Sequence, residues 1–290
     1  MTTYIKANTF AELYMNAIDH VYNEPDFETA PRGLKIKECL NAVLELTNPR
    51  NNLFRCDDKK LTLQTGYLKR ELALYLAGIN KSSYFAKASK FWDSIKNDDG
   101  TVNSAYGYLV FKLKNKHGYT QFDWVVKSLI ADKDSRQAIM HFNRESHQYD
   151  DVKDFPCTLS TTFHIRNDKL HMTTVMRSND IRKGLQYDLP FFTLLQQLVL
   201  LKLKPTYPSL ELGSYVHMSQ SLHIYESDFD YAKGIINAKL EPNGIPELND
   251  PNVVMSYDID KIVSLKFDGQ DLLFGYELSR NSDFYDWLLT

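Results

Sequence analysis

With 290 residues, the chain is long for an average domain but within the range of one large domain. Hydrophobic residues make up 43% and charged residues 24%, a balance that can bury a large core. The 34 Lys and Arg residues against 37 Asp and Glu give a net charge of −3, which argues against a broad basic surface for nucleic acid or anionic membranes. This net charge is compatible with a small anionic ligand that is bound by a few arginines.

Helical periodicity and strand-like alternation both occur along the chain. A helix is expected to about residue 22, then a loop over 23–38 with two prolines and a glycine, and an amphipathic run over 36–46. The following elements are helices over 66–78 and 122–131, strands over 137–143, 157–165 and 169–178, a helix over 190–204, and strands over 213–225, 261–268 and 272–278.

This order predicts an α+β fold in a single domain, 1–290, with a C-terminal extension from about 240 to 290. Repeats, low-complexity tracts and interdomain linkers are absent from the sequence. The most apolar segment, 189–204, is interrupted by Gln196 and Gln197 and is too short to span a bilayer, so we expect a buried helix there. Without a signal-peptide pattern at the start, we expect a cytoplasmic protein.

The three cysteines are widely spaced and form no CxxC pair, which argues against a disulfide framework or a zinc cluster and for a reducing compartment. Cys157 follows Pro156 at the start of a predicted strand. If 166–169 is the turn of a hairpin, Arg177 at the end of the next strand lies near Cys157. Positive charge beside a cysteine favours the nucleophilic thiolate. Without such neighbours, a buried cysteine is usually a small hydrophobe.

Several segments together resemble the thymidylate synthase family, over roughly residues 32–231. The matching segments are RELALYLAG, FWDSIKNDDGTVNSAYG, DSRQAIMHFNR, KDFPCTLSTTF, MRSNDIRKGLQYD and GSYVHMSQSLHIY, in the family's order and spacing. The resemblance implies a large mixed β-sheet covered by helices and a sheet-to-sheet homodimer with shared active sites. It also implies a folate co-substrate, 5,10-methylenetetrahydrofolate, and no metal.

Three departures resemble the pyrimidine-nucleotide hydroxymethylases within that family, the phage deoxycytidylate branch in particular. Thr158 follows the cysteine where classical synthases have histidine, Ser221 and Leu222 replace a Gly-Asp pair, and NSAYG replaces Gly-Pro-x-Tyr-Gly. Such an enzyme would serve nucleotide biosynthesis and DNA modification in a bacteriophage, in the host cytoplasm.

Asp188 occupies the position where thymidylate synthases read the base with asparagine. An amide can satisfy uracil O4 and N3–H together, whereas cytosine presents an amino donor and a bare N3 acceptor. A carboxyl group that shares one proton can pair with both cytosine groups. The alternative role for Asp188 is a helix N-cap before the run at 189–204.

The resemblance implies the following reaction on dCMP. Cys157 adds to C6 of the pyrimidine, C5 attacks the folate methylene carbon, loss of the C5 proton and tetrahydrofolate leaves an exocyclic methylene, and water adds to it. Glu71 organises proton transfer and the attacking water. The other implied roles are phosphate binding by Arg32, Arg136 of the partner subunit, Arg177 and Ser178; sugar binding by His223 and Tyr225; and folate binding by Trp92, Asp180 and Tyr106.

Several alternatives stay open at this point. The enzyme could act as a deoxyuridylate or CMP hydroxymethylase, a thymidylate synthase or a cytidylate methylase, and Gln137 stands where the family has a second phosphate-binding arginine. A non-catalytic nucleotide- or RNA-binding relative is a further alternative, against which Cys157, Glu71 and Arg177 and the lack of a basic face argue. Neither a membrane nor a nucleic acid is an expected partner.

Overall fold

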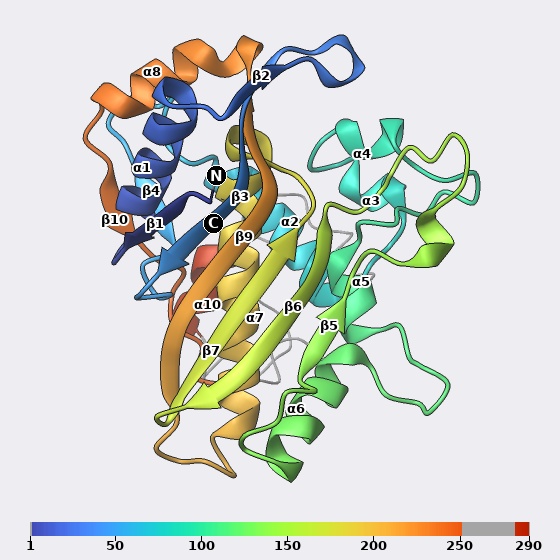
Figure 1. Cartoon of the computed structure of the whole chain (residues 1–290). Helices are drawn as coiled ribbons and strands as arrows, with labels where there is room; N and C mark the ends of the chain where they lie inside the picture. Colours follow the sequence, from blue (N-terminus) through green and yellow to red (C-terminus); the bar gives the residue numbers. More distant parts are fainter. Residues whose placement is uncertain (1, 251–281, 290) are drawn as a thin grey trace. The chain divides into compact units, whose positions relative to one another are not determined.

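The computed structural model describes residues 2–250 and 282–289 (Figure 1). The predicted strands at 261–268 and 272–278 lie outside the described residues. The chain forms two compact units, one of 1–63, 157–197 and 209–245, the other of 64–156, 198–208 and 246–290. Each unit is described by itself.

The first unit is built on a mixed sheet whose strands pair in the order β1-β3-β9-β7-β6, with β2 beside β3 and β8 beside β9. The pairs β1–β3, β7–β9 and β8–β9 are parallel and the others antiparallel. The sheet elements are β1 (Tyr4–Ala7), β2 (Phe27–Thr29), β3 (Ile36–Leu46), β6 (Thr158–Arg166), β7 (Lys169–Met176), β8 (Asn179–Asp180) and β9 (Glu211–Tyr225).

Helices and a small second sheet complete this unit. They are α1 (Phe10–Asn23), η1 (Pro31–Gly33), the π-helix η3 (Ile181–Leu185), the start of α7 (Gln186–Leu203), η4 (Glu226–Asp228) and α8 (Phe229–Asn237), with β4 (Leu53–Arg55) paired to β10 (Glu241–Asn243). Inside α7, Gln196 Nε2 donates to the carbonyl oxygen of Leu170 on β7 at 2.8 Å, which fixes the helix against the sheet. The unbroken burial of 189–200 confirms the predicted core helix.

The β6–β7 hairpin is the element that positions the cysteine. Its turn residues, Asn167 and Asp168, have φ of 50° and 52°, the left-handed pair that a tight two-residue turn requires and that Asn and Asp tolerate. The register pairs Arg166 with Lys169 and Thr158 with Met176. The predicted hairpin is therefore confirmed.

Two expectations about the N-terminal third need correction. The segment 23–38, expected to be a loop, contains β2, whose three residues are all exposed and so give no burial alternation in the sequence. A strand, Tyr4–Ala7, precedes the expected first helix, which begins only at Phe10, after Thr9 caps it by accepting from Glu12 N. The amphipathic run over 36–46 forms the strand β3.

The second unit is mainly helical. Its elements are α2 (Thr65–Ala77), α3 (Ser82–Phe85), α4 (Phe91–Ser94), α5 (Tyr106–Phe111), α6 (Gln121–Ala131), β5 (Ile139–His141), η2 (Glu145–His147), the end of α7 and α10 (Ser282–Leu289). As predicted, α2 ends at a glycine, because Gly78 takes the left-handed conformation (φ 65°) and donates back to Leu74 and Tyr75. A capping box of Thr120 and Asp123 begins α6.

Candidate active site

In the first unit, the end of the hairpin brings Cys157 and Arg177 together. Arg177 N donates to Cys157 O at 2.9 Å, and Arg177 Nη2 lies 3.6 Å from Cys157 Sγ. The cysteine is half-buried, so its sulfur is not sealed in the core. A guanidinium at this distance favours the thiolate, which is the reactive form of cysteine.

Asp188 lies inside α7, two residues after its start, so it does not cap the helix. Its Oδ2 accepts a hydrogen bond of 2.8 Å from Asn179 Nδ2. Burial of the carboxyl group raises the pKa of Asp188 to about 7, and the negative charge of Asp180 acts in the same direction, while the Asn179 hydrogen bond opposes the shift. Near neutral pH this carboxyl group can therefore both donate and accept.

His223 and Tyr225 lie two residues apart on β9, and their rings contact edge to face with centroids 5.2 Å apart. This confirms that they share one side of the strand. In the register, His223 pairs with Asp180 on β8. Burial lowers the pKa of His223 and raises the pKa of Asp180, so each tends to its neutral form. Lys183 Nζ lies 5.0 Å from the centroid of the Tyr225 ring.

The remaining predicted residues of the first unit are Arg32 and Ser178. Arg32 is exposed in η1 and has a φ of 53°, a left-handed conformation that costs a non-glycine residue about 1 kcal/mol. Ser178 is half-buried between Arg177 and Asn179, at the step from β7 to β8.

In the second unit, Glu71 belongs to a hydrogen-bond network of three side chains. Tyr67, one turn earlier on α2, donates its hydroxyl to Glu71 Oε1 at 2.8 Å and accepts from Trp92 Nε1 at 3.1 Å. Glu71 and Trp92 are each 6% exposed. A buried carboxylate needs hydrogen-bond donors, and the Tyr67 hydroxyl group, held in place by Trp92, supplies one in a fixed direction.

Tyr106 and Arg136 also lie in the second unit. Tyr106 is buried, stacked on Tyr75 at 5.7 Å and in edge contact with Phe142 at 5.2 Å. Arg136 is exposed in the turn after α6. In the first unit, the structure thus brings together three clusters of site residues. The first is Cys157, Arg177 and Ser178, the second is Asn179 with Asp188, and the third is Asp180 with His223. In the second unit, Tyr67 links Glu71 to Trp92.

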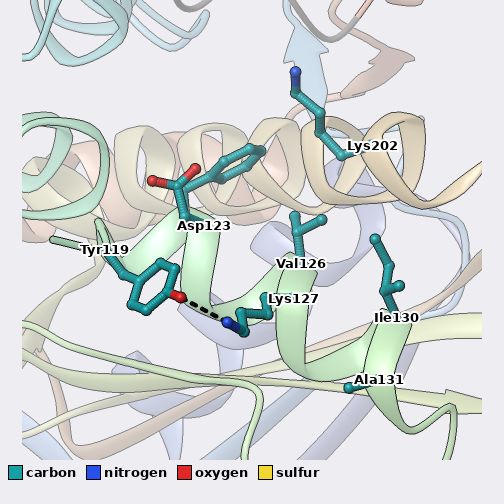
Figure 2. A pocket seen from close by; sticks show the side chains of 8 residues that line it. Tyr119, Asp123, Val126, Lys127, Ile130, Ala131 and Lys202 are labelled. Carbon is teal, nitrogen blue, oxygen red and sulfur yellow. Dashed lines mark hydrogen bonds between the residues drawn. The ribbon is translucent and has the colours of Figure 1, made fainter. Parts of the chain in front are cut away.

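A pocket of about 580 Å³ also lies in the second unit, along α6 (Figure 2). Its lining includes Phe122, Val126 and Ile130, and at its rim Lys127 Nζ donates to the hydroxyl of Tyr119 at 2.6 Å. None of the predicted site residues lines this pocket. The pocket is therefore not built from the residues whose chemistry the sequence indicates.

Sequence reasoning missed two residues that contact predicted ones, Asn179 and Tyr67. Tyr67 could have been found, because it lies four residues before Glu71 on a predicted helix and that spacing places two side chains side by side. Asn179 could not, because its contact with Asp188 spans nine residues and depends on the π-helix between them.

The fold, the cysteine beside an arginine and the carboxyl group on α7 together point to one class of enzyme, and the similarity to known proteins identifies it. The thymidylate synthase profile matches residues 12–274, so the chain belongs to the thymidylate synthase family. Members of this family modify C5 of pyrimidine nucleotides and use methylenetetrahydrofolate.

Relatives with different names are about equally similar to this chain. A deoxyuridylate hydroxymethyltransferase of Bacillus phage SP01 is 28% identical over 87% of this chain and 69% of its own length. A deoxycytidylate 5-hydroxymethyltransferase of Enterobacteria phage T4 is 30% identical over 71% and 82%, respectively. A thymidylate synthase of Bacillus atrophaeus is 30% identical over 74% and 95%.

The three residues that are expected to hold the folate differ in how well their surroundings allow contact with it. The half-buried carboxyl group of Asp180 can accept hydrogen bonds from a pterin ring, although its Oδ1 already accepts from the backbone of Arg182 and Lys183. Trp92 and Tyr106 are 6% and 5% exposed and so have little free ring surface for stacking. Within residues 2–250 and 282–289, no group of three or more His, Cys, Asp or Glu could hold a metal ion, and no helix is long and apolar enough to cross a membrane.

Proposed function

We propose that the chain is a deoxycytidylate 5-hydroxymethyltransferase, converting dCMP to 5-hydroxymethyl-dCMP. The observation that carries the proposal is the half-buried carboxyl group of Asp188, whose pKa is raised by burial to about 7. By resemblance, this residue stands where thymidylate synthases read the base with asparagine. A half-protonated carboxyl group offers a donor to cytosine N3 and an acceptor to its amino group. Uracil presents the opposite pair, and mispaired buried polar groups are strongly discriminated against.

Each remaining residue has a role in this proposal. Cys157, with the Arg177 guanidinium 3.6 Å from its sulfur to favour the thiolate, adds to C6 and makes C5 nucleophilic. Glu71, oriented by Tyr67, removes the C5 proton and directs water to the exocyclic carbon. Arg32, Arg177, Ser178 and Arg136 of the partner subunit bind the phosphate, and His223 and Tyr225 bind the sugar. Asp180 accepts hydrogen bonds from the folate, which supplies the one-carbon unit, while the covered rings of Trp92 and Tyr106 support the walls of the site and do not stack on the folate.

A homodimer with shared sites belongs to the same proposal, with the sheets of two copies face to face. Met218 supports it, because this apolar side chain on the central strand β9 is 36% exposed. A measured solution mass of one chain at working concentrations would contradict it. We place the reaction in the cytoplasm, in the host if the source is a phage.

One further candidate function has specific support. The SP01 relative named deoxyuridylate hydroxymethyltransferase matches 87% of this chain. Mass analysis of the products from dCMP, CMP and dUMP with methylenetetrahydrofolate distinguishes the candidates. We expect hydroxymethyl-dCMP without dihydrofolate; hydroxymethyl-dUMP would favour the further candidate, and a methylated product with dihydrofolate would indicate a synthase or methylase.

Replacing Asp188 with Asn tests the base-reading role directly. An amide suits uracil, so activity on dCMP should fall and activity on dUMP rise, each by roughly 5- to 150-fold, since one mispaired buried group costs about 1–3 kcal/mol. The measurement is kcat/KM for both nucleotides with wild type and variant. An unchanged preference would remove Asp188 from base recognition.

A further inference from the structure

The contact between Asn179 and Asp188 is tightly packed. Asn179 is fixed on β8, which pairs with β9, and it is 3% exposed. Gly184, in the π-helix between the two residues, leaves the necessary space: a Cβ there would lie 2.7 Å from Asn179 Nδ2 and 3.1 Å from Asp188 Oδ2. Any larger residue at 184 would push the pair apart.

The Asn179 amide is satisfied on one side only. Its Nδ2 donates to Asp188, while its Oδ1 is buried without a hydrogen-bond partner among the described residues. A buried unpaired carbonyl oxygen is unfavourable, and two apolar side chains of similar shape would avoid that cost. The cost of this unpaired oxygen offsets part of what the Nδ2 hydrogen bond contributes to stability, and the amide has a further effect on Asp188.

That effect concerns the two oxygens of the carboxyl group. Because Asn179 donates to Oδ2, that oxygen acts as acceptor and a carboxyl proton resides on Oδ1. One oxygen then donates and the other accepts, with their order fixed. A carboxyl group free to hold its proton on either oxygen could present the pattern for cytosine or the reverse pattern for uracil.

We propose that Asn179 is a specificity-determining positioning residue, which fixes the proton of Asp188 on Oδ1 and thereby makes the carboxyl group selective for one pyrimidine base. This inference rests on the proposed function, because it concerns how Asp188 reads the base. Asn179 acts through Asp188 and needs no contact with the nucleotide.

The electrostatic surroundings of Asp188 agree with this role. Among the described residues, the titratable groups that act with its carboxyl group are Asp180, on β8, and Tyr215, on β9. Neither supplies positive charge. The hydrogen bond from Asn179 is thus the favourable interaction that holds the pKa of Asp188 down against burial.

The test is Asn179→Leu, which keeps the volume and removes the donor. With ¹³C-labelled aspartate, the Asp188 carboxyl resonance is assigned by its loss in Asp188→Asn and titrated in the nucleotide-free protein. We expect the pKa of Asp188 to rise by about one pH unit or more in Asn179→Leu, the size of a lost hydrogen bond to a charged group. The ratio of dissociation constants for dUMP and dCMP should move toward one by roughly tenfold.

Gly184→Ala is the second variant, because it keeps both groups and displaces their contact; it should move the titration and the ratio in the same direction. An unchanged Asp188 titration and an unchanged ratio in either folded variant would overturn the role of Asn179. If the wild type binds dUMP more tightly than dCMP, the assignment to cytosine fails instead. The titration in the nucleotide-free protein still decides the role of Asn179 in that case.

Discussion

At the scale of single residues, the proposed role of Cys157 predicts that binding and chemistry can be separated. Its sulfur contacts Arg177, whereas the proposed sugar and base contacts come from β9 and α7. Replacing Cys157 with Ser should therefore reduce turnover by about a thousandfold or more while the dissociation constant for dCMP changes less than about threefold. Steady-state rates and calorimetric binding provide the two measurements.

The matched control is Cys56→Ser, which changes a second half-buried cysteine of the same unit. It should retain full turnover. Near-normal turnover in the Cys157 variant would end the argument for a covalent adduct.

Tyr67 has a narrower effect, on the orientation of Glu71. Tyr67→Phe removes the 2.8 Å hydrogen bond to Glu71 and leaves Trp92 Nε1 without this acceptor. Hydrogen bonds to charged groups contribute about 1.5–3 kcal/mol, so kcat should fall by about 10- to 100-fold with KM for the nucleotide nearly unchanged. Tyr119→Phe, which removes the surface hydrogen bond from Lys127, is the control. Equal losses in the two variants would show that Tyr67 does not orient Glu71.

At the scale of secondary-structure elements, the approach of α2 and α5 depends on one glycine. A Cβ at Gly107 would lie 1.9 Å from the carbonyl oxygen of Tyr75, a backbone atom that can move only if the helices separate. Gly107→Ala should lower the free energy of unfolding by about 1–3 kcal/mol. Gly66→Ala is the matched control, since an added Cβ meets nothing within 4 Å there, and helix propensity gives up to about 1 kcal/mol of stabilisation. Denaturant unfolding that ranks the two variants equally would contradict the close approach.

The elements also show what the sequence could and could not predict. The hairpin was predictable because Asn167 and Asp168 combine a local turn preference with alternating strands on both sides. In β3 the alternation is interrupted at Asn41, which has a φ of 54°, so buried positions change phase along one strand. The segments 181–185 and 186–203 form a π-helix followed by an α-helix, and no local signal in the sequence marks that change.

At the scale of the whole molecule, the order of several motifs predicted the family. Each motif alone has low specificity for the family, whereas the occurrence of all of them in the same order is highly specific. The contacts that set the pKa values of the site residues could not be predicted from the order of the motifs. The pKa of Asp188 depends on burial and on Asn179, which only the folded chain supplies. The sequence thus predicts which residues carry the chemistry, and the tertiary structure determines the protonation of a residue such as Asp188.

Two groups whose pKa values are shifted by burial make opposite contributions to the pH dependence of stability. His217 is fully buried, with a pKa lowered by burial to about 3 from an ordinary 6.5, so below about pH 6.5 the unfolded chain binds a proton that the folded chain does not. Stability from His217 is therefore lost as the pH falls. Asp188, with its pKa raised to about 7 from an ordinary 3.8, binds its proton more tightly when folded, so its contribution improves as the pH falls from about 7 to 4.

Replacing His217 with Gln isolates the first contribution, because the amide can still contact the hydroxyl of Tyr215, now 2.9 Å from His217 Nδ1, but does not titrate. Asp188 is common to both proteins and cancels in the difference. Between about pH 7.5 and pH 5, the wild type should lose about 2 kcal/mol relative to the variant, at about 1.4 kcal/mol per pH unit below 6.5. Denaturant unfolding at both pH values measures this difference. A difference that does not change with pH would mean that His217 is not held neutral in the folded chain.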